Sequence, residues 1–178
     1  MRIEIPEKIN AIITHYEGNG YEAYCVGGSI RDSVMGIGIG DWDITTSALP
    51  TETKELFKNE KIVETGIKHG TVSIIKDHEA IEVTTFRIDG EYSDNRHPEQ
   101  VSFTRNLNED LKRRDFTVNA LAYSHRTGLV DLYGGLNDIE NKIIRTVGNA
   151  EDRFLVDGLR IMRALRFASV LGFTIEKE

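Results

Sequence analysis

A glycine pair near the N-terminus has the setting of a phosphate-binding turn. Residues 27 and 28 are both glycine, and they separate the apolar segment Tyr21–Val26 from a predicted helix at Ser29–Met35. A strand, a glycine turn and a helix N-terminus together offer backbone N–H groups and a favourable dipole to a phosphate. Arg31, one turn into that helix, would reach a second phosphate oxygen. The alternative is a plain tight turn with Arg31 as a surface charge.

A pair of aspartates follows about a dozen residues later, in the triplet Asp41-Trp42-Asp43. Asp41–Thr45 is predicted to be a strand, where positions i and i+2 face the same side, so Asp41 and Asp43 are expected to project together. Two neighbouring carboxylates repel unless a hard cation lies between them, and Mg²⁺ binds through one or two carboxylates plus substrate phosphates. Alone, the triplet also fits two exposed carboxylates at a strand end. With the glycine pair it indicates phosphoryl or nucleotidyl transfer.

Hydrophobic spacing predicts a mixed α/β domain that positions these groups, over about residues 1–148. Helices are expected at residues 6–17, 29–35, 50–58, 108–114 and 116–122. Strands are expected at residues 21–26, 41–45, 71–76, 80–86, 129–132 and 143–147. Of the connections, Asp77-His78-Glu79 joins a hairpin, residues 87–104 form a long polar loop, and Gly134-Gly135 is a turn.

The pattern changes at Asn149, which is suited to cap a helix. An apolar stripe then continues to Gly172 and predicts a helix or a kinked helix pair over residues 149–178. Met162 and Leu165 of this stripe are expected in the core. The apolar face is wide, so further helices are expected to pack against it.

Composition leaves the partner open. The 178 residues carry a net charge of −7, which argues against a generally basic nucleic-acid coat but not against a local basic patch. Cys25 is the single cysteine, which fits a reducing compartment. The N-terminus lacks the apolar core of a signal peptide and no run is long enough to span a bilayer. A cytoplasmic protein is expected.

Four sequence motifs in order carry a family resemblance. They are Val26–Thr46 (VGGSIRD, then DWDITT), Arg113–Ala120 (RRDFTVNA), Asp131–Gly135 (DLYGG) and Asp157–Ala168 (DGLRIMRALRFA). With them, nearly the whole chain from about Tyr21 resembles the class II tRNA nucleotidyltransferases (CCA-adding enzymes) and the bacterial poly(A) polymerases.

The resemblance implies a DNA polymerase β-like nucleotidyltransferase head at 1–148, with a mixed sheet, followed at 149–178 by the start of a helical neck. Asp41 and Asp43 would be the catalytic residues and would hold two Mg²⁺. Glu82 is a candidate for a third carboxylate, although a surface glutamate in an alternating strand is the other reading.

The resemblance also implies a nucleotide site. In the first motif the nucleotide-binding residues would be Gly27, Gly28, Ser29 and Arg31. In the second motif Arg114, Asp115 and Asn119 would contact the nucleotide and its ribose 2′-hydroxyl. In the fourth motif Asp157 and Arg160 would recognise the base, with Arg163 and Arg166 near the triphosphate.

The expected choice of base has a chemical reason. A carboxylate such as Asp157 accepts from an exocyclic amine, which cytosine and adenine carry where uracil and guanine present a carbonyl. Val156 stands where the family usually has a glutamate, and this departure bears on the positioning of Arg160 and on the accuracy of the switch from C to A.

The resulting hypothesis is an enzyme that adds C and A from CTP and ATP to the 3′ end of tRNA. The loop at 87–104 resembles a flexible loop that the family needs for adding the terminal A. The alternatives are a poly(A) polymerase, a CC-adding or A-adding relative, and a nucleotide-binding module without turnover. Family members carry further neck, body and tail regions, so a fragment of a longer protein is expected.

Overall fold

The protein is described by a computed structural model, in which residues 1–89, 101–149 and 159–177 are placed. The helices and 3₁₀ turns are α1 Glu7–Gly18, α2 Gly28–Met35, α3 Pro50–Leu56, η1 Ile67–His69, α4 Leu107–Lys112, η2 Thr117–Asn119, α5 Gly135–Asn141 and α7 Leu159–Leu171. The strands are β1 Ala23–Val26, β2 Asp43–Thr46, β3 Lys61–Val63, β4 Thr71–Lys76, β5 Glu79–Thr85, β6 Arg87–Asp89, β7 Val101–Phe103, β8 Leu121–Ser124, β9 Gly128–Asp131, β10 Ile143–Ile144 and β11 Thr174–Ile175.

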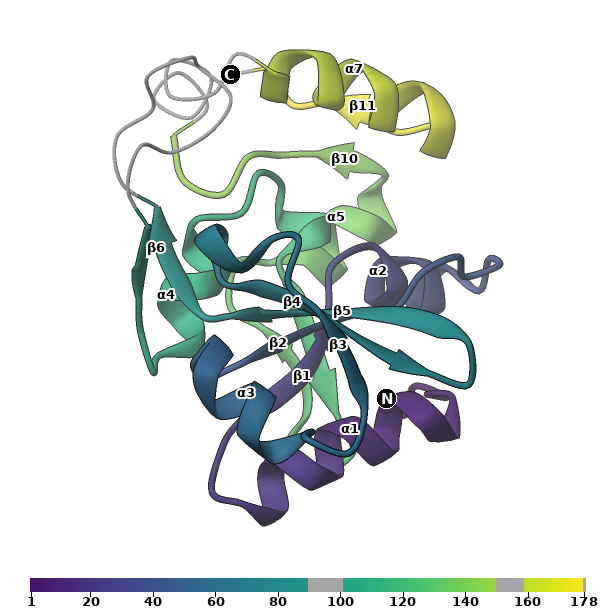
Figure 1. Cartoon of the computed structure of the whole chain (residues 1–178). Coiled ribbons are helices and arrows are strands. Elements are labelled where there is room, and N and C mark those ends of the chain that lie inside the picture. The colour runs from purple at the N-terminus through teal and green to yellow at the C-terminus, as the bar shows by residue number, and fades with distance from the viewer. Residues whose placement is uncertain (90–100, 150–158, 178) are drawn as a thin grey trace.

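Seven strands of the described ranges form one mixed sheet, in the order β3-β4-β5-β2-β1-β8-β9. β2 and β5 are parallel and the other neighbours are antiparallel. Two small sheets, β6 with β7 and β10 with β11, complete the pairing. Figure 1 shows α1 and α3 at one end of the molecule and α7 at the other, with the large sheet between them. The predicted mixed α/β class is confirmed.

The central strand β1 shows how the two faces of the sheet are assigned. Ala23 and Cys25 pack into one hydrophobic core with α1, whereas Tyr24 and Val26 pack into another with α4. This alternation follows from the two-residue period of a strand. Val26 is paired with Asp43 on β2, and directly paired residues share a face. Asp43 therefore lies on the α4 face.

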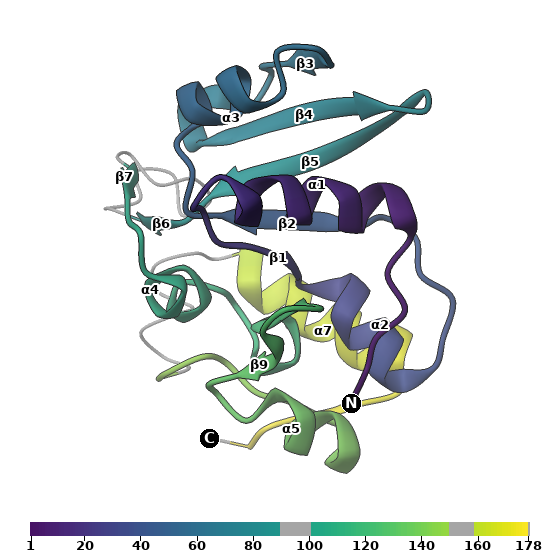
Figure 2. The same cartoon turned by 90° about the horizontal axis from the view of Figure 1, so that it is seen from below.

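The first helix forms where the sequence predicts it. Ile9, Ile12, Ile13 and Tyr16 are its buried residues, and this spacing gives one apolar stripe along a helix. The stripe packs against the sheet, and Figure 2 shows α1 lying over the central strands.

The helix α7 packs on the opposite end with part of its surface only. Ala164 is buried with Phe116 and Ile144, and Phe167 packs against the same cluster. Met162 is 64% exposed and Leu165 is 54% exposed, so the prediction that both lie in the core is wrong for the described residues. The face of α7 that carries Met162 and Leu165 points away from the sheet. No other part of the described chain covers it.

Three other predictions about elements are corrected. The segment 116–122 is not one α-helix: it holds only the 3₁₀ turn η2, and from residue 121 on the chain pairs with β1 and β9, which prevails over local propensity. The ends of the predicted loop 87–104 are paired strands, β6 and β7; residues 90–100 lie outside the described ranges. The predicted turn at Gly134-Gly135 opens the helix α5, which the sequence reading missed.

The third motif, Asp131–Gly135, has a structural role that explains its residues. Both carboxylate oxygens of Asp131 accept from the start of α5, at 2.7 Å from the backbone N–H of Gly135 and 3.0 Å from that of Leu136. A Cβ at Gly135 would overlap the carbonyl oxygen of Thr117 and touch Leu121. Only glycine therefore lets α5 approach η2, which carries part of the expected nucleotide site.

Replacing Gly135 by Ala is accordingly expected to destabilise the fold by about 1 to 3 kcal/mol, because the overlap is with backbone. Thermal unfolding measures the effect, and a decrease of roughly 2–4 °C per kcal/mol is expected for a chain of this size. Gly38→Ala is the control, since a Cβ there meets nothing within 4 Å. Equal melting temperatures for the two variants would contradict this assignment.

The described helices include no segment that is both long enough and apolar enough to cross a bilayer. The cytoplasmic location expected from the sequence stays a prediction.

Candidate active site

Three carboxylates gather at one end of the central strands. Asp43 is the first residue of β2, and Asp41 and Glu82 line the same cleft. The parallel register pairs Ile44 with Val83, so Asp43 and Glu82 precede two paired residues and lie on the same face of the sheet. The sequence alone favoured a surface glutamate at this position. Glu82 is indeed exposed on the alternating strand β5, and it also lines the cleft of the two aspartates.

Asp41 is not part of the strand, which corrects the prediction of a strand over Asp41–Thr45. The pairing of β2 with β1 ends at Val26 and Asp43. The chain turns away at Gly27, so the residues just before Asp43 have no partner on β1. Trp42 still packs against the α1-side core, as expected from alternation. Asp41 and Asp43 line one cleft without a regular strand between them.

The environment of Asp43 fits a site for a cation. Partial burial raises its pKa, the negative charge of Glu82 and then of Asp41 adds to this, and Arg114 opposes it. Carboxylate oxygens are the ligands that a hard divalent cation prefers. Within the ranges described, no three Asp, Glu, His or Cys side chains are arranged as a ready metal cluster. Asp41 and Asp43 supply carboxylate oxygens at this cleft, and their role as metal ligands stays a prediction.

The glycine pair adopts a backbone that requires glycine. Gly27 precedes α2 with φ 80° and ψ −138°, a region that residues with a Cβ rarely enter. Its N–H donates to the carbonyl of Leu121, and its carbonyl accepts from Ile30 and Arg31. The first N–H groups of a helix have no partners within the helix. Those at the start of α2 lie where the sequence predicts a phosphate, and that role stays a prediction.

Arg31 connects three parts of the chain. It is 9% exposed, its Nη1 donates to Asn119 Oδ1 at 2.6 Å, and its Nε donates to Asp32 at 3.0 Å. Its guanidinium also lies 5.1 Å from the ring centre of Phe167 on α7. Arg31 thus joins the glycine turn, the second motif and α7, and it is held more firmly than the surface-charge alternative allows.

A second set of contacts ties α7 to the second motif. Arg163 Nη1 pairs with Asp115 Oδ2 at 2.6 Å, and its guanidinium lies 5.6 Å from the ring centre of Phe167. Asp115 Oδ1 accepts from the backbone N–H of Phe116 at 2.7 Å. Asn119 Nδ2 lies 3.4 Å from the same oxygen. Asp115 and Asn119, predicted to act together, do lie together.

The remaining predicted residues differ in how far they are placed. Ser29 is buried and lies 3.5 Å from the carbonyl of Val26, and Arg166 is exposed. Arg160 is 5% exposed and its Nη2 donates to the carbonyl of Arg113 at 2.8 Å. Asp157 and Val156 lie outside the described residues.

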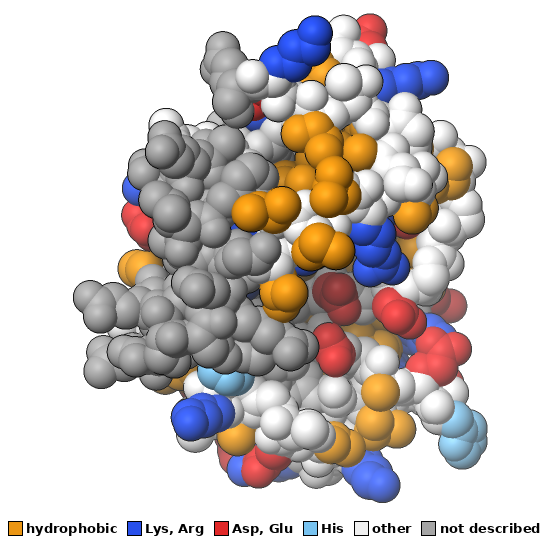
Figure 3. Space-filling view, turned by 90° about the horizontal axis from the view of Figure 1, so that it is seen from above, with side chains coloured by type: hydrophobic (Ala, Val, Ile, Leu, Met, Phe, Trp, Pro, Cys, Tyr) orange, Lys and Arg blue, Asp and Glu red, His pale blue; other side chains and the backbone are white. Residues whose placement is uncertain are grey.

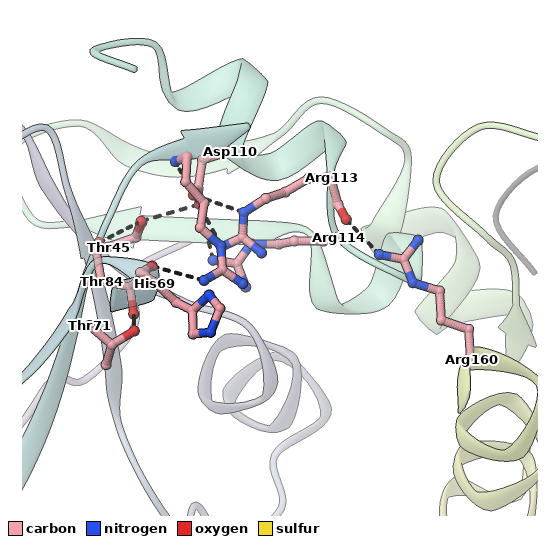
Figure 4. Close-up of polar contacts among 9 residues, drawn as sticks. Thr45, His69, Thr71, Thr84, Asp110, Arg113, Arg114 and Arg160 are labelled. Carbon is pink, nitrogen blue, oxygen red and sulfur yellow. Dashed lines mark hydrogen bonds and ion pairs between the residues drawn. The ribbon is translucent and has the colours of Figure 1, made fainter. Parts of the chain in front are cut away.

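Two residues that sequence reasoning did not select belong to this site. Asp110 on α4 is fully buried, and its Oδ2 accepts from Arg114 at 3.1 Å; Figure 4 shows the guanidiniums of Arg113 and Arg114 reaching toward it. The spacing of an aspartate three and four residues before two arginines is the signal that would have found it. Phe167 is an apolar residue of the predicted C-terminal helix, and two guanidiniums lie against its ring.

The surface at the α7 end of the molecule has hydrophobic and acidic side chains close together (Figure 3). Figure 3 faces this end of the molecule and shows a hydrophobic patch close to a group of acidic side chains. The exposed hydrophobic residues on α7 are Leu159, Ile161, Met162, Leu165 and Val170.

Comparison with known proteins is consistent with this geometry. Residues 23–145 match the family described as Poly A polymerase head domain. The chain is 53% identical over 178 residues to the CCA-adding enzyme of Lactiplantibacillus plantarum, covering 98% of this chain and 43% of that protein. It is 52% identical over 172 residues to the CCA-adding enzyme of Geobacillus kaustophilus, covering 97% and 42% respectively.

Solved structures agree with the sequence matches. The Bacillus stearothermophilus CCA-adding enzyme in complex with CTP superposes with a TM-score of 0.87 at 46% identity, covering 98% of this chain and 42% of that one. A tRNA nucleotidyltransferase complexed with a primer tRNA and an incoming ATP analog gives a TM-score of 0.72 at 31% identity, covering 93% and 46%. The chain thus spans less than half the length of these relatives.

Proposed function

Since the chain belongs to the Poly A polymerase head domain family, we propose that it is the catalytic head of an RNA 3′-end nucleotidyltransferase. The whole protein would add C and A from CTP and ATP to the 3′ terminus of tRNA. The relatives that support this are named CCA-adding enzymes, and related structures hold CTP, or a primer tRNA with an ATP analog.

One observation carries the proposal: the acidic cleft and the glycine turn occupy adjacent strand ends. Asp43 is paired with Val26, the residue immediately before Gly27. A metal at the carboxylates and a phosphate at the N-terminus of α2 would therefore be neighbours. That is the arrangement that a nucleotidyl transfer needs, since the reacting phosphate must meet the cation.

The metal would be held by Asp41 and Asp43, with Glu82 as a third carboxylate. Nucleotidyltransferases generally use divalent metal ions, and Mg²⁺ is the ion we propose. Bound there, it would neutralise charge on the transferring phosphate and activate the attacking 3′-hydroxyl. The three carboxylates would orient it, and binding would relieve the repulsion from Glu82 and Asp41 that adds to burial in raising the pKa of Asp43.

The nucleotide would lie between the glycine turn and the arginines. The N–H groups at Gly28 and Ser29 would receive the triphosphate, and Arg114 would add a charged donor beside Gly27, since its Nη1 lies 3.9 Å from the position of a Cβ there. Its Nε is a buried donor with no hydrogen-bond partner among the described residues. A phosphate or ribose oxygen would satisfy it.

The base would be read by Arg160 of α7 together with Asp157. We propose that Arg160 and Asp157 face the base and that Arg163 and Arg166 lie toward the triphosphate. The support is positional: Arg160 is bound to the carbonyl of Arg113, next to Arg114, so α7 is attached directly to the second motif. With this division of roles, residues 1–148 would be the head and residues 149–178 the start of the neck.

The experiment uses the whole protein, because the chain spans 43% of its L. plantarum relative. A tRNA lacking its 3′ terminus is incubated with each nucleoside triphosphate singly and together. Addition of C from CTP and of one A from ATP is expected, with no addition from UTP or GTP. Long A tails on unrelated RNA would instead identify a poly(A) polymerase, and binding of CTP or ATP without incorporation would identify a module without turnover.

A further inference from the structure

The most strongly enclosed charge in the described structure is the carboxylate of Asp110, which has no exposed surface. It accepts from three different elements, as Figure 4 shows in part. Its partners are Thr45 Oγ1 at 3.2 Å, the backbone N–H of Arg87 at 3.1 Å, Arg113 Nε and Nη2 at 3.3 and 3.2 Å, and Arg114 Nη2 at 3.1 Å.

The carboxylate is ionised in this setting. Burial alone would raise the pKa of Asp110, but the Arg114 and Arg113 guanidiniums and the backbone N–H of Arg87 outweigh burial and hold it below its ordinary value. A buried charge is tolerated only when it is paired and hydrogen-bonded, and both oxygens of Asp110 are. Removing the charge would leave two guanidiniums without their common partner.

The end of α4 decides which groups Asp110 contacts. Arg113 is the C-cap of α4 and Arg114 follows it; they come three and four residues after Asp110, and both side chains return to its carboxylate. Arg114 is one of the predicted nucleotide-binding residues, and its Nη1 lies beside Gly27. Since Nη2 is fixed by Asp110, the direction of the planar guanidinium toward the glycine turn is fixed as well.

The same carboxylate ties two strands to these arginines. Thr45 lies two residues after Asp43 on β2, so the strand that begins with the metal carboxylate is attached to the arginine pair. Arg87 is the first residue of β6, and its N–H anchors that strand to the same oxygen as Arg113.

We propose that Asp110 is a positioning residue of the nucleotide site: it aims the Arg114 guanidinium at the phosphate cradle and fixes that arginine relative to β2 and β6. The inference rests on the proposed function, because it takes Arg114 to be a nucleotide contact. Asp110 itself touches no substrate. Its effect on the reaction is transmitted through Arg114.

A matched control is available in the same chain. Asp138 is 2% exposed and also joins a threonine to an arginine: its Oδ2 accepts from Thr117 Oγ1 at 2.6 Å and from Arg145 Nε at 3.1 Å. Arg145 is not a predicted nucleotide contact. Asp138→Asn therefore removes a comparable buried charge without touching Arg113 or Arg114.

The experiment compares Asp110→Asn with Asp138→Asn by measuring the Kd of CTP and of ATP in the presence of Mg²⁺, together with thermal unfolding. Both variants are expected to melt at lower temperature. Asp110→Asn is expected to raise the Kd of both nucleotides by about tenfold or more. Asp138→Asn is expected to change each Kd by less than about twofold. Thr45→Val, which removes one donor to the carboxylate, is expected to weaken binding to a smaller extent and decides the matter if Asp110→Asn does not fold.

A double variant separates positioning from general loss of stability. If Asp110 acts through Arg114, Asp110→Asn combined with Arg114→Lys binds nucleotide no more weakly than Arg114→Lys alone, because the two changes remove one interaction. Additive losses, or equal effects of the two aspartate variants, would overturn the inference and leave the proposed function intact. If the unchanged protein binds neither CTP nor ATP, the proposed function fails and the inference with it.

Discussion

Replacing Asp43 by Asn is expected to abolish Mg²⁺-dependent nucleotide addition while making the metal-free protein slightly more stable. The loss of activity should be on the order of 10³-fold or more, because a carboxylate that holds the cation contributes several kcal/mol to the transition state. The gain in stability follows from the raised pKa of Asp43. Partial burial and the negative charges of Glu82 and Asp41 disfavour its ionised carboxylate.

The sign of the stability effect depends on pH. A carboxyl group whose pKa is raised in the folded state destabilises the fold as the pH rises through that pKa. The unchanged protein is therefore destabilised by Asp43 at neutral pH, but not below about pH 4, near the ordinary pKa of aspartate. Since the side chain is solvent-accessible, the expected gain for Asp43→Asn at pH 7 is small, roughly 1–2 °C in Tm. Below about pH 4 the difference should disappear.

The control and the metal complete this test. Asp77 lies in the exposed hairpin turn at φ 51°, where asparagine is tolerated. The control variant Asp77→Asn is therefore expected to change neither activity nor Tm. Mg²⁺ with CTP should raise the Tm of the unchanged protein and of Asp77→Asn, but much less that of Asp43→Asn. An Asp43→Asn protein with full activity would remove Asp43 from the metal site.

Replacing Gly27 by Ala is expected to damage both the fold and the binding of nucleotide. The φ of 80° and ψ of −138° suit only glycine, so alanine stores about 1–3 kcal/mol of backbone strain or shifts the turn. Steric overlap is not the cause, because the nearest heavy atom to a Cβ there, Arg114 Nη1, is 3.9 Å away. A shifted turn would misdirect the first N–H groups of α2, and the Kd of CTP and ATP is expected to rise by about tenfold or more.

Gly36 at the other end of the same helix provides the comparison. It has φ 71° and ψ 25°, and a Cβ there meets nothing within 4 Å. Gly36→Ala is therefore expected to cost about 1–2 kcal/mol of strain without changing the Kd of either nucleotide. If Gly27→Ala and Gly36→Ala bind nucleotide equally well, the turn at Gly27 is not a phosphate cradle.

The elements around the site were largely predictable because their signals are local. The isoleucines of α1 repeat at helical spacing, the glycine pair separates β1 from α2, and the segments 71–76 and 80–86 alternate as a hairpin requires. The two residues at the turn of that hairpin, Asp77 and His78, both have positive φ, which is the conformation of a two-residue hairpin turn.

The errors arose where pairing partners decide the structure. Residues 121–124 form β8 because β1 and β9 lie on either side of them, and nothing in the segment itself shows this. Asp41 falls outside β2 because β1 ends at Val26, the partner of Asp43. The helix α5 begins where Asp131 accepts from two backbone N–H groups, a contact whose geometry is visible only after the chain has folded.

The residues proposed for the site could be selected from the sequence, but the contacts among them could not, and their roles stay predictions. Asp41, Asp43, Gly27 and Arg114 were selected from sequence, and the structure places them around adjacent strand ends. Some contacts between arginines and carboxylates join elements that are distant in sequence. Others, such as the contact of Asp110 with Arg114, are made by side chains that point inward from a helix. Their partners are therefore visible only in three dimensions, and Asp157 and Val156 lie outside the described residues.

The measurement that tests the central claim most directly is a crystal structure of the protein with CTP and Mg²⁺. We expect metal density between the carboxylates of Asp41 and Asp43, and the triphosphate against the N–H groups at the start of α2, within reach of Arg114. A triphosphate bound elsewhere, with no metal at the two aspartates, would contradict the account.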